Sequence, residues 1–246
     1  MKDFFITRCM FCLLSLVGLS CSSLPQFDIS STHQVVLSIA PDWNSNKGTV
    51  YLFDKTSDGW KQHGGSWSVS YGKNGLGWGD GLQEQQIGEY VKHEGDKRSP
   101  AGIFEFGMLY GFDASAPEGV RYPYQQLTEQ TRCVDDVDSK AYNQIVEEAV
   151  PVNDWKSAER MRYAEPDYKY VLVVEHNKNR EKKKGSCIFF HINNTPTTGC
   201  TSMDEDDILT LLRWLDRDKQ TLLVQLPHAE YHRLRTKWKL PKLTGN

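Results

Sequence analysis

The stretch IFFHINNTPTTGCTSM, residues 188–203, decides how the rest of the chain is interpreted. An apolar run rich in aromatic and β-branched residues ends at His191, and nine residues later Cys200 follows a glycine. Runs of this composition form buried β-strands. A histidine at a strand end and a cysteine so close to it indicate either a nucleophile with its base or a buried thiol beside an ordinary strand.

The residues after Cys200 predict a helix whose start bears on the thiol. Ser202 and Glu205 have the spacing of a capping box. The apolar residues that follow recur with the helical period, at Ile208, Leu211, Leu212 and Leu215. Cys200 would then lie just outside a helix N-terminus, where the macrodipole lowers a thiol pKa, although the acidic first turn opposes this.

A cysteine paired with a histidine suits acyl transfer, in which a thiolate attacks a carbonyl and the acyl group then passes to an amine or water. Backbone amides of Gly199, Cys200 and Thr201 could hold the developing oxyanion. Gly199 would also let the backbone pass close to a substrate. This chemistry needs no cofactor, because the thiolate supplies the nucleophile and backbone dipoles supply the electrostatics.

The rest of the chain predicts one mixed domain, mainly β with a few helices, from residue 33 to 246. Strands are expected at 33–40, 49–55, 66–72, 168–177, 186–192 and 221–227, since these runs are apolar and rich in β-branched or aromatic residues. Residues 139–149 and 154–161 look helical or turn-like, and 229–238 predicts a terminal helix. The basic run 178–185 is expected to be a solvated hairpin loop, with contact to an anionic polymer or membrane surface as the alternative.

The N-terminus resembles an export signal. Residues 1–20 combine a short charged region with an apolar segment too short to span a bilayer. The segment VGLSCSS (17–23) resembles a lipobox, which would make Cys21 an acylated anchor and residues 21–32 a tether. Cleavage without a lipid is the alternative, and both place the protein outside the cytoplasm.

The remaining cysteines are odd in number. If Cys9 and Cys12 leave with the signal and Cys21 is the anchor, then Cys133, Cys187 and Cys200 remain. An odd cysteine in an exported protein suggests one disulfide and one free thiol. A Cys133–Cys187 disulfide is the pairing that leaves Cys200 free.

Composition excludes some partners. The formal net charge of −3 does not favour nucleic acid. His228 and His232 are four apart on the predicted terminal helix, but no third ligand is evident, so no metal site is expected.

The segment from Thr197 to Cys200 resembles the catalytic motif of the YkuD-type L,D-transpeptidases, in which a strand histidine precedes an S/T-x-G-C segment. EGDKRSPAGIF (94–104) resembles a strand entry of the same family, and the phrases at 133–143, 154–161 and 185–192 occur in the same order in one of its branches. The resemblance extends from about residue 50 to 227. The commoner motif has a longer His-to-Cys interval and an arginine where this chain has Ser202, which bears on substrate and acceptor preference.

The resemblance implies a β-rich L,D-transpeptidase domain of curved, sandwich-like or barrel-like sheets that acts on peptidoglycan stem peptides. Cys200 would be the nucleophile and His191 the base. Thr197, Thr198, Gly199, Thr201 and Ser202 would shape the oxyanion and substrate pocket. The group that orients His191 is left open between a backbone carbonyl, Asp135 and Asp136. His176 is noted as a possible neighbour of the site.

Three alternatives accompany this reading. The same site could use water, as an L,D-carboxypeptidase or amidase. The chain could be a peptidoglycan-binding lipoprotein without catalysis, although the presence of both Cys200 and His191 argues against that. It could also be an exported structural β-domain. A lipid anchor would place the protein on the periplasmic side of a membrane, with the outer membrane slightly favoured because Ser22 gives no aspartate-type retention signal.

Overall fold

The computed structural model of the protein describes residues 28–148, 153–162 and 166–243. The expected signal at 1–20, the candidate lipidation site Cys21 and most of the expected tether lie outside these residues. The last part of that tether belongs to the domain. Ile29 is buried, and its amide donates to the Trp238 carbonyl at 3.3 Å. The domain therefore begins before residue 33, because an apolar side chain at residue 29 packs against the C-terminal helix.

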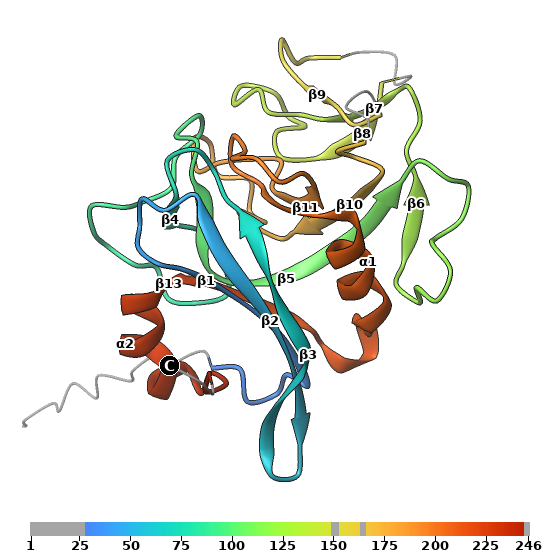
Figure 1. Ribbon diagram of the computed structural model, residues 1–246. Coiled ribbons are helices and arrows are strands. Elements are labelled where there is room, and N and C mark those ends of the chain that lie inside the picture. Colours follow the sequence, from blue (N-terminus) through green and yellow to red (C-terminus); the bar gives the residue numbers. More distant parts are fainter. Residues whose placement is uncertain (1–27, 149–152, 163–165, 244–246) are drawn as a thin grey trace, which may run out of the picture.

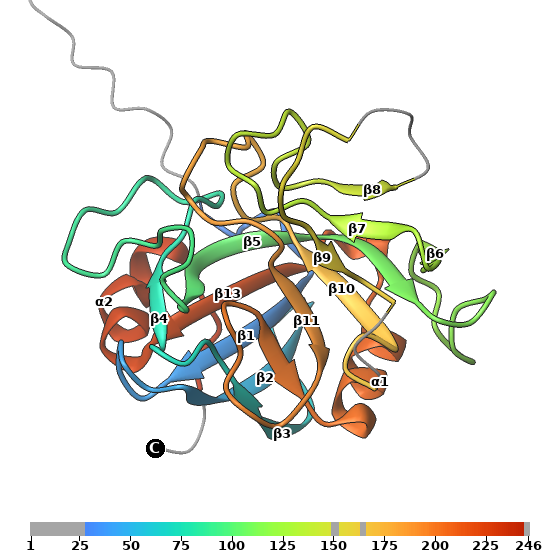
Figure 2. The ribbon, with the colours of Figure 1, turned by 90° about the horizontal axis from the view of Figure 1, so that it is seen from above.

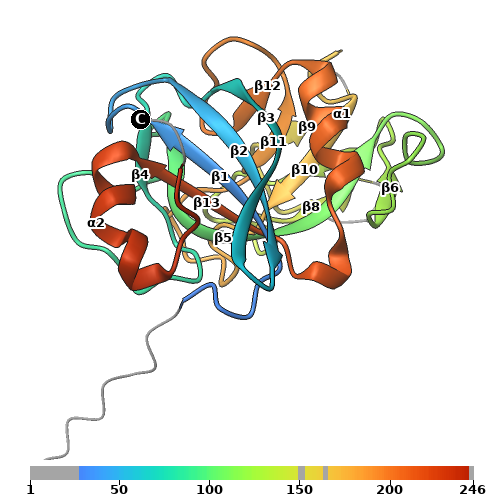
Figure 3. The same ribbon diagram turned by 60° about the horizontal axis from the view of Figure 1, so that its bottom comes forward.

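Eight strands close into a barrel (Figures 1 and 3). Around the ring the order is β10, β11, β12, β3, β2, β1, β13 and β5, and antiparallel pairing of β5 with β10 closes it. Two short strands, β4 (Leu76–Trp78) and β6 (Tyr124–Gln126), add to β5 in parallel. The barrel strands are β1 (Gln34–Ala40), β2 (Lys47–Thr56), β3 (Gly59–Ser70), β5 (Ser99–Gly111), β10 (Tyr170–Val174), β11 (Phe189–Ile192), β12 (Thr201–Met203) and β13 (Leu222–Pro227).

Two α-helices, α1 (Glu205–Trp214) and α2 (His228–Trp238), cover different sides of the barrel (Figure 3). A 3₁₀ helix, η1 (Arg217–Lys219), follows α1. Both α-helices bury apolar side chains in the main core. Because strands outnumber helices among the described residues, the domain is mainly β with a few helices, as expected. Within the described residues, no helix combines the length and apolar character needed to cross a bilayer.

Alternation along β11 separates two apolar layers. Phe190 and Ile192 belong to the core inside the barrel, whereas Phe189 packs in a second cluster with Cys200. Successive side chains of a strand point to opposite faces, so His191 lies on the same outer face as Phe189. The predicted hairpin of β10 and β11 is confirmed, and their antiparallel pairing places Val171 opposite His191.

A small three-stranded sheet lies over β10 and β11 (Figures 1 and 2). It consists of β7 (Thr131–Cys133), β8 (Ile145–Glu147) and β9 (Glu159–Arg160), with β7 in the middle. Helix formation within 139–149 and 154–161 is therefore wrong. Short pieces of both segments pair with β7 instead, and turns occupy part of the first.

A disulfide joins this small sheet to the start of β11. Cys133 in β7 bonds to Cys187, with their Cα atoms 5.9 Å apart, and among the described residues Cys200 is the free cysteine. The predicted pairing is confirmed. The disulfide holds β7, and with it β9, beside the outer face that carries Cys200.

The expected helix start is wrong. Ser202 lies in β12, which pairs in parallel with β11, and the N-cap of α1 is Asp204, whose side chain makes no capping hydrogen bond. The strand continues through Met203 because its residues complete the barrel. Cys200 is thus separated from the helix N-terminus by a whole strand.

We predict that replacing Cys133 and Cys187 by serine destabilises the domain. The disulfide closes a loop with a sequence separation of 54 residues, for which chain entropy gives a stabilisation of about 4 kcal/mol. The check is urea unfolding of the double variant beside the wild type. An unchanged free energy of unfolding would contradict this assignment.

We predict that the buried His176 makes stability fall with acidification. Burial, followed by the nearby Lys92, lowers the His176 pKa to about 4. In the unfolded chain the pKa is about 6.5, so between these values the unfolded state binds more protons and stability decreases as pH falls, by about 3 kcal/mol in total.

The measurement is the free energy of unfolding from pH 7 to pH 4 for wild type and His176→Gln. The variant should lose this part of the pH dependence. Parallel pH profiles for the two proteins would contradict the prediction.

Candidate active site

The outer face of the barrel and the small sheet enclose a cavity of about 460 Å³ that contains both residues of the expected pair. Cys200 and His191 contribute the barrel side, and the two are 7% and 5% exposed. Thr197 and Thr198 line the cavity from the connection between β11 and β12. Four of the expected site residues are therefore brought together. The remaining lining residues are Ala158, Glu159, Arg160, Asp167, Tyr168 and Asn193.

His191 is oriented by a backbone carbonyl. Its Nδ1 lies 3.0 Å from the Ile192 carbonyl oxygen. Because a carbonyl can only accept, Nδ1 carries the proton and the neutral ring keeps a lone pair on Nε2. Burial lowers the His191 pKa, which favours the neutral ring. His191 is therefore prepared to accept a proton.

The two aspartates considered for this orienting role have other partners. Asp135 accepts from the Ser157 hydroxyl at 2.6 Å, and Asp136 accepts from the Lys156 amide at 2.7 Å. The backbone carbonyl of Ile192 is therefore the group that orients His191.

His176 lies outside the cavity. Its Nδ1 accepts from the Asp80 amide at 3.2 Å, and its Nε2 donates to a carbonyl in the basic loop.

The Cys200 thiol is neutral, and the two opposing influences expected at a helix N-terminus do not decide its pKa. Burial raises the pKa of the Cys200 thiol, and the negative charge of Glu159 adds to this effect. The Sγ atom accepts from the Phe189 amide at 3.3 Å and donates to the Cys187 carbonyl at 3.5 Å. With the helix N-terminus beyond β12, no macrodipole compensates for burial. Without such compensation, burial keeps the proton on sulfur.

Two hydroxyl groups hold the Cys200 carbonyl. Ser99, at the start of β5, donates to it at 2.7 Å, and Thr197 donates at 2.6 Å. Ser99 also accepts from the Gly72 amide at 2.9 Å. A Cβ at Gly72 would overlap the backbone of Lys97, so glycine permits this close approach. The segment 94–104 thus helps to position Cys200, a role that the sequence did not assign to Ser99.

Three of the expected pocket residues are used differently. The Gly199 amide donates to Thr197 Oγ1 at 3.1 Å, so in this structure it is not free to hold an oxyanion. A Cβ at Gly199 would make only ordinary contacts, which removes the packing reason for glycine. Thr201 is buried and bonds to Gln225 at 3.0 Å. Ser202 donates to the Thr195 carbonyl at 3.4 Å, and neither residue lines the cavity.

Two residues of the cavity were missed from the sequence. Tyr168 is buried, packs edge-to-face on the His191 ring with centroids 5.2 Å apart, and donates its hydroxyl to Glu159. Glu159 lies within the segment 154–161, DWKSAERM, which carries part of the family resemblance, but nothing in that segment assigns it a role. Tyr168 had no sequence signal, because its relation to His191 depends on the folded arrangement.

Lys92 is a further buried charge near the nucleophile. Its Nζ pairs with Asp96 at 2.8 Å. Asp96 also accepts the amides of His93 and Arg98, and so shapes the turn that enters β5. The Lys92 charge lowers the pKa of the Cys200 thiol, but less than burial and Glu159 raise it.

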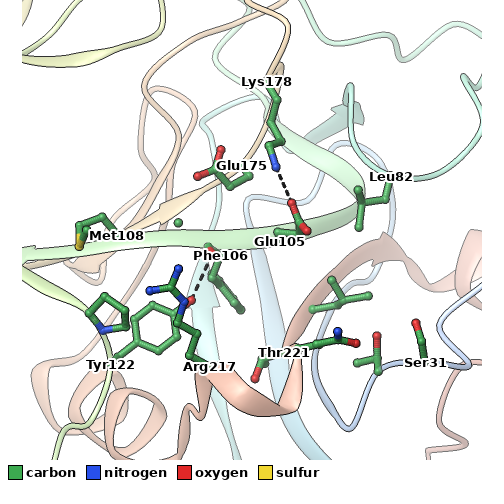
Figure 4. A pocket seen from close by; sticks show the side chains of 15 residues that line it. Ser31, Leu82, Glu105, Phe106, Met108, Tyr122, Glu175, Lys178, Arg217 and Thr221 are labelled. Carbon is green, nitrogen blue, oxygen red and sulfur yellow. Dashed lines mark hydrogen bonds and ion pairs between the residues drawn. The ribbon is translucent and has the colours of Figure 1, made fainter.

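A second cavity, of about 560 Å³, is shown in Figure 4. It is lined by β5 around Phe106 and by Glu175, Arg217 and Tyr122, with an ion pair between Lys178 and Glu105 at 2.6 Å. Neither a cysteine nor a histidine contributes to its lining. This cavity therefore offers no cysteine and histidine pair of the kind found beneath the small sheet.

His228 and His232 bring their Nε2 atoms within 3.0 Å of each other on α2. Among the described residues, no group of three or more histidine, cysteine or acidic side chains is arranged to hold a metal ion.

No protein-family description, curated protein or solved structure matches the chain. The chemistry of the cavity must therefore be argued from its own residues.

We predict that Ser99→Ala loosens the Cys200 backbone. The change removes two hydrogen bonds of a buried hydroxyl, which corresponds to about 1–3 kcal/mol of stability, and alkylation of Cys200 by iodoacetamide should become several-fold faster. The matched control is Thr201→Val, which removes a buried hydroxyl that bonds to Gln225 instead. Equal alkylation rates in the two variants would contradict a specific role for Ser99.

Proposed function

We propose that the protein is a cysteine-dependent acyltransferase that acts on peptidoglycan stem peptides, a YkuD-type L,D-transpeptidase. The observation that carries this proposal is that His191 and Cys200 line one cavity, with the His191 Nδ1 proton held by a carbonyl. A neutral thiol and a neutral imidazole that line one cavity are a suitable starting state for nucleophilic attack on an amide.

The segments that carry the family resemblance converge on this cavity. Ser99 from 94–104 bonds to the Cys200 carbonyl, and Glu159 from 154–161 lines the cavity. The Cys187 carbonyl, from 185–192, accepts the Cys200 thiol. Segments far apart in sequence thus contact one nucleophile, which supports a shared catalytic purpose. The barrel-like, mainly β domain agrees with this fold family.

The proposed reaction has two halves. The Cys200 proton passes to His191 Nε2 as sulfur attacks the carbonyl at the L-centre of the third stem-peptide residue. The tetrahedral intermediate collapses, the terminal D-amino acid leaves with that proton on its amine, and a thioester remains. An amine then takes the acyl group, which gives crosslinking, D-amino acid exchange or attachment to a protein. Water in place of the amine would make the protein a carboxypeptidase or amidase.

The location that fits this substrate is the periplasmic side of a membrane, reached by export and a lipid on Cys21. A disulfide between Cys133 and Cys187 supports an oxidising compartment, because such bonds form and persist there. We place the protein at the outer membrane, with its peptidoglycan substrate adjacent.

The test is product analysis by mass spectrometry after incubation with a disaccharide-tetrapeptide, alone and with a D-amino acid. Wild type should release the terminal residue and incorporate the added D-amino acid. Cys200→Ala and His191→Ala should do neither, at least a thousandfold below wild type by analogy with other nucleophile and base removals.

The matched control is His228→Ala, which removes a histidine outside the cavity and should leave both reactions unchanged. Release without incorporation would identify a hydrolase. No release by wild type with a reduced Cys200 thiol would contradict the proposal and favour a peptidoglycan-binding protein.

A further inference from the structure

Glu159 approaches the Cys200 cavity from the small sheet, opposite the barrel face that carries His191. It lies in β9, whose pairing with β7 aligns it with Cys133 of the disulfide. The residue is partly exposed and contributes to the cavity lining. The carboxylate therefore faces the space in which a substrate would meet the thiol.

Glu159 is held in place through one oxygen. The Tyr168 hydroxyl donates to Glu159 Oε1, and the Tyr168 ring packs edge-to-face against His191 and Phe189, with centroids 5.2 and 6.0 Å away. The other acid of the cavity, Asp167, accepts the Asn193 side-chain amide at 2.6 Å. Asp167 is thus hydrogen-bonded to the β11–β12 connection. Among the described residues, the Glu159 carboxylate is hydrogen-bonded only to the hydroxyl of Tyr168, whose packed ring fixes that hydroxyl in place.

The charge of Glu159 works against formation of a thiolate. It raises the pKa of Cys200, second only to burial. Glu159 would therefore hinder formation of the acyl-enzyme, in which the Cys200 sulfur loses its proton. If the carboxylate has a catalytic role, that role belongs to a different step. The Glu159 carboxyl itself has a raised pKa, with burial as the main cause, partly offset by the Tyr168 hydrogen bond. A carboxylate with a raised pKa is a better proton acceptor near neutral pH than an ordinary one.

The second half of the proposed reaction supplies that step. The acceptor amine arrives as an ammonium ion, which is attracted to a carboxylate but cannot attack a thioester until it loses a proton. We propose that Glu159 is a catalytic residue that docks the acceptor ammonium and removes its first proton. This inference rests on the proposed function.

The protons and bonds balance as follows. The ammonium gives one proton to the Glu159 carboxylate, and the free amine attacks the thioester carbon. The new C–N bond forms, the nitrogen gives a second proton to His191 Nε2, and the C–S bond breaks. The departing sulfur takes the proton from His191, so Cys200 returns to a thiol, and Glu159 later releases its proton to solvent.

The carboxylate would also bias the reaction toward amines. An ammonium acceptor gains an electrostatic attraction from Glu159 that uncharged water does not. Loss of the negative charge should therefore change how the acyl-enzyme is divided between amine and water, rather than how quickly it forms.

The experiment compares wild type and Glu159→Gln, which keeps the shape and an oxygen that can accept the Tyr168 hydroxyl. Quenched-flow mass spectrometry gives the rate of acyl-enzyme formation, and product analysis with isotopically labelled D-alanine as the acceptor gives the ratio of D-alanine transfer to hydrolysis. The variant should acylate at the wild-type rate or faster, while its transfer-to-hydrolysis ratio falls at least tenfold. Glu159→Ala should give the same fall, so the test survives if one variant does not fold.

Hydroxylamine provides the diagnostic acceptor, because it is uncharged at neutral pH and needs no docking charge. Its transfer should be unaffected by Glu159→Gln, whereas a residue that merely supports the fold would affect both acceptors. The matched control is Glu175→Gln, a partly buried carboxyl in the other cavity whose pKa is also raised by burial.

An unchanged ratio with D-alanine, or an equal loss of acylation and of transfer to both acceptors, would overturn the inference alone. A wild-type protein that forms no acyl-enzyme would overturn the proposed function itself, and this inference with it.

Discussion

The parallel pairing of β11 with β12 is the constraint on which the candidate site depends. It aligns Phe190 with Thr201 and His191 with Ser202, so Cys200 lies beside Phe189 at the strand start. Parallel neighbours usually need a crossover of about a dozen residues or more. Here the connection is only residues 193–200, and hydrogen bonds from Ser99 and Thr197 to the Cys200 carbonyl fasten its end. Strand alternation then places the thiol and imidazole on one outer face.

The small sheet converts this face into a cavity. Without it, Cys200 and Phe189 would lie open on the outside of the barrel. The Cys133–Cys187 disulfide and the apolar cluster around Met161 hold the sheet down. Enclosure has an electrostatic consequence, because burial opposes charge on both the thiol and the imidazole. The enclosed thiol and imidazole are therefore both neutral.

Much of the barrel could be predicted from the sequence because its strands are long apolar runs. The runs around β1, β10, β11 and β13 carry enough β-branched and aromatic residues to be recognised locally. The middle and end of α1 were equally predictable from the helical period of its apolar residues, but its first residue was not. The spacing of Ser202 and Glu205 predicts a helix cap. The pairing of Ser202 with β11, which places it in a strand, cannot be inferred from the residues around it.

The small sheet was less predictable for the same reason. β8 and β9 are strands of three and two residues, and each exists because it pairs with β7. Local composition at 139–149 suggested a helix or a turn, and the turn forms in part of the segment while tertiary pairing makes a strand of Ile145–Glu147. The spacing of His191 and Cys200 left a buried thiol open, and the family resemblance of the motif singled them out as candidate base and nucleophile. Glu159 and Tyr168 could not be singled out in this way, since their relation to His191 arises only when the small sheet closes over the barrel.

The most direct test of this account is the intact mass of the protein after rapid quenching with a tetrapeptide donor and no amine. The account predicts an adduct equal to the donor minus its terminal residue, located by peptide mapping on Cys200 and absent from Cys200→Ala. Release of the terminal residue without an adduct on Cys200, or equal release by Cys200→Ala, would contradict it.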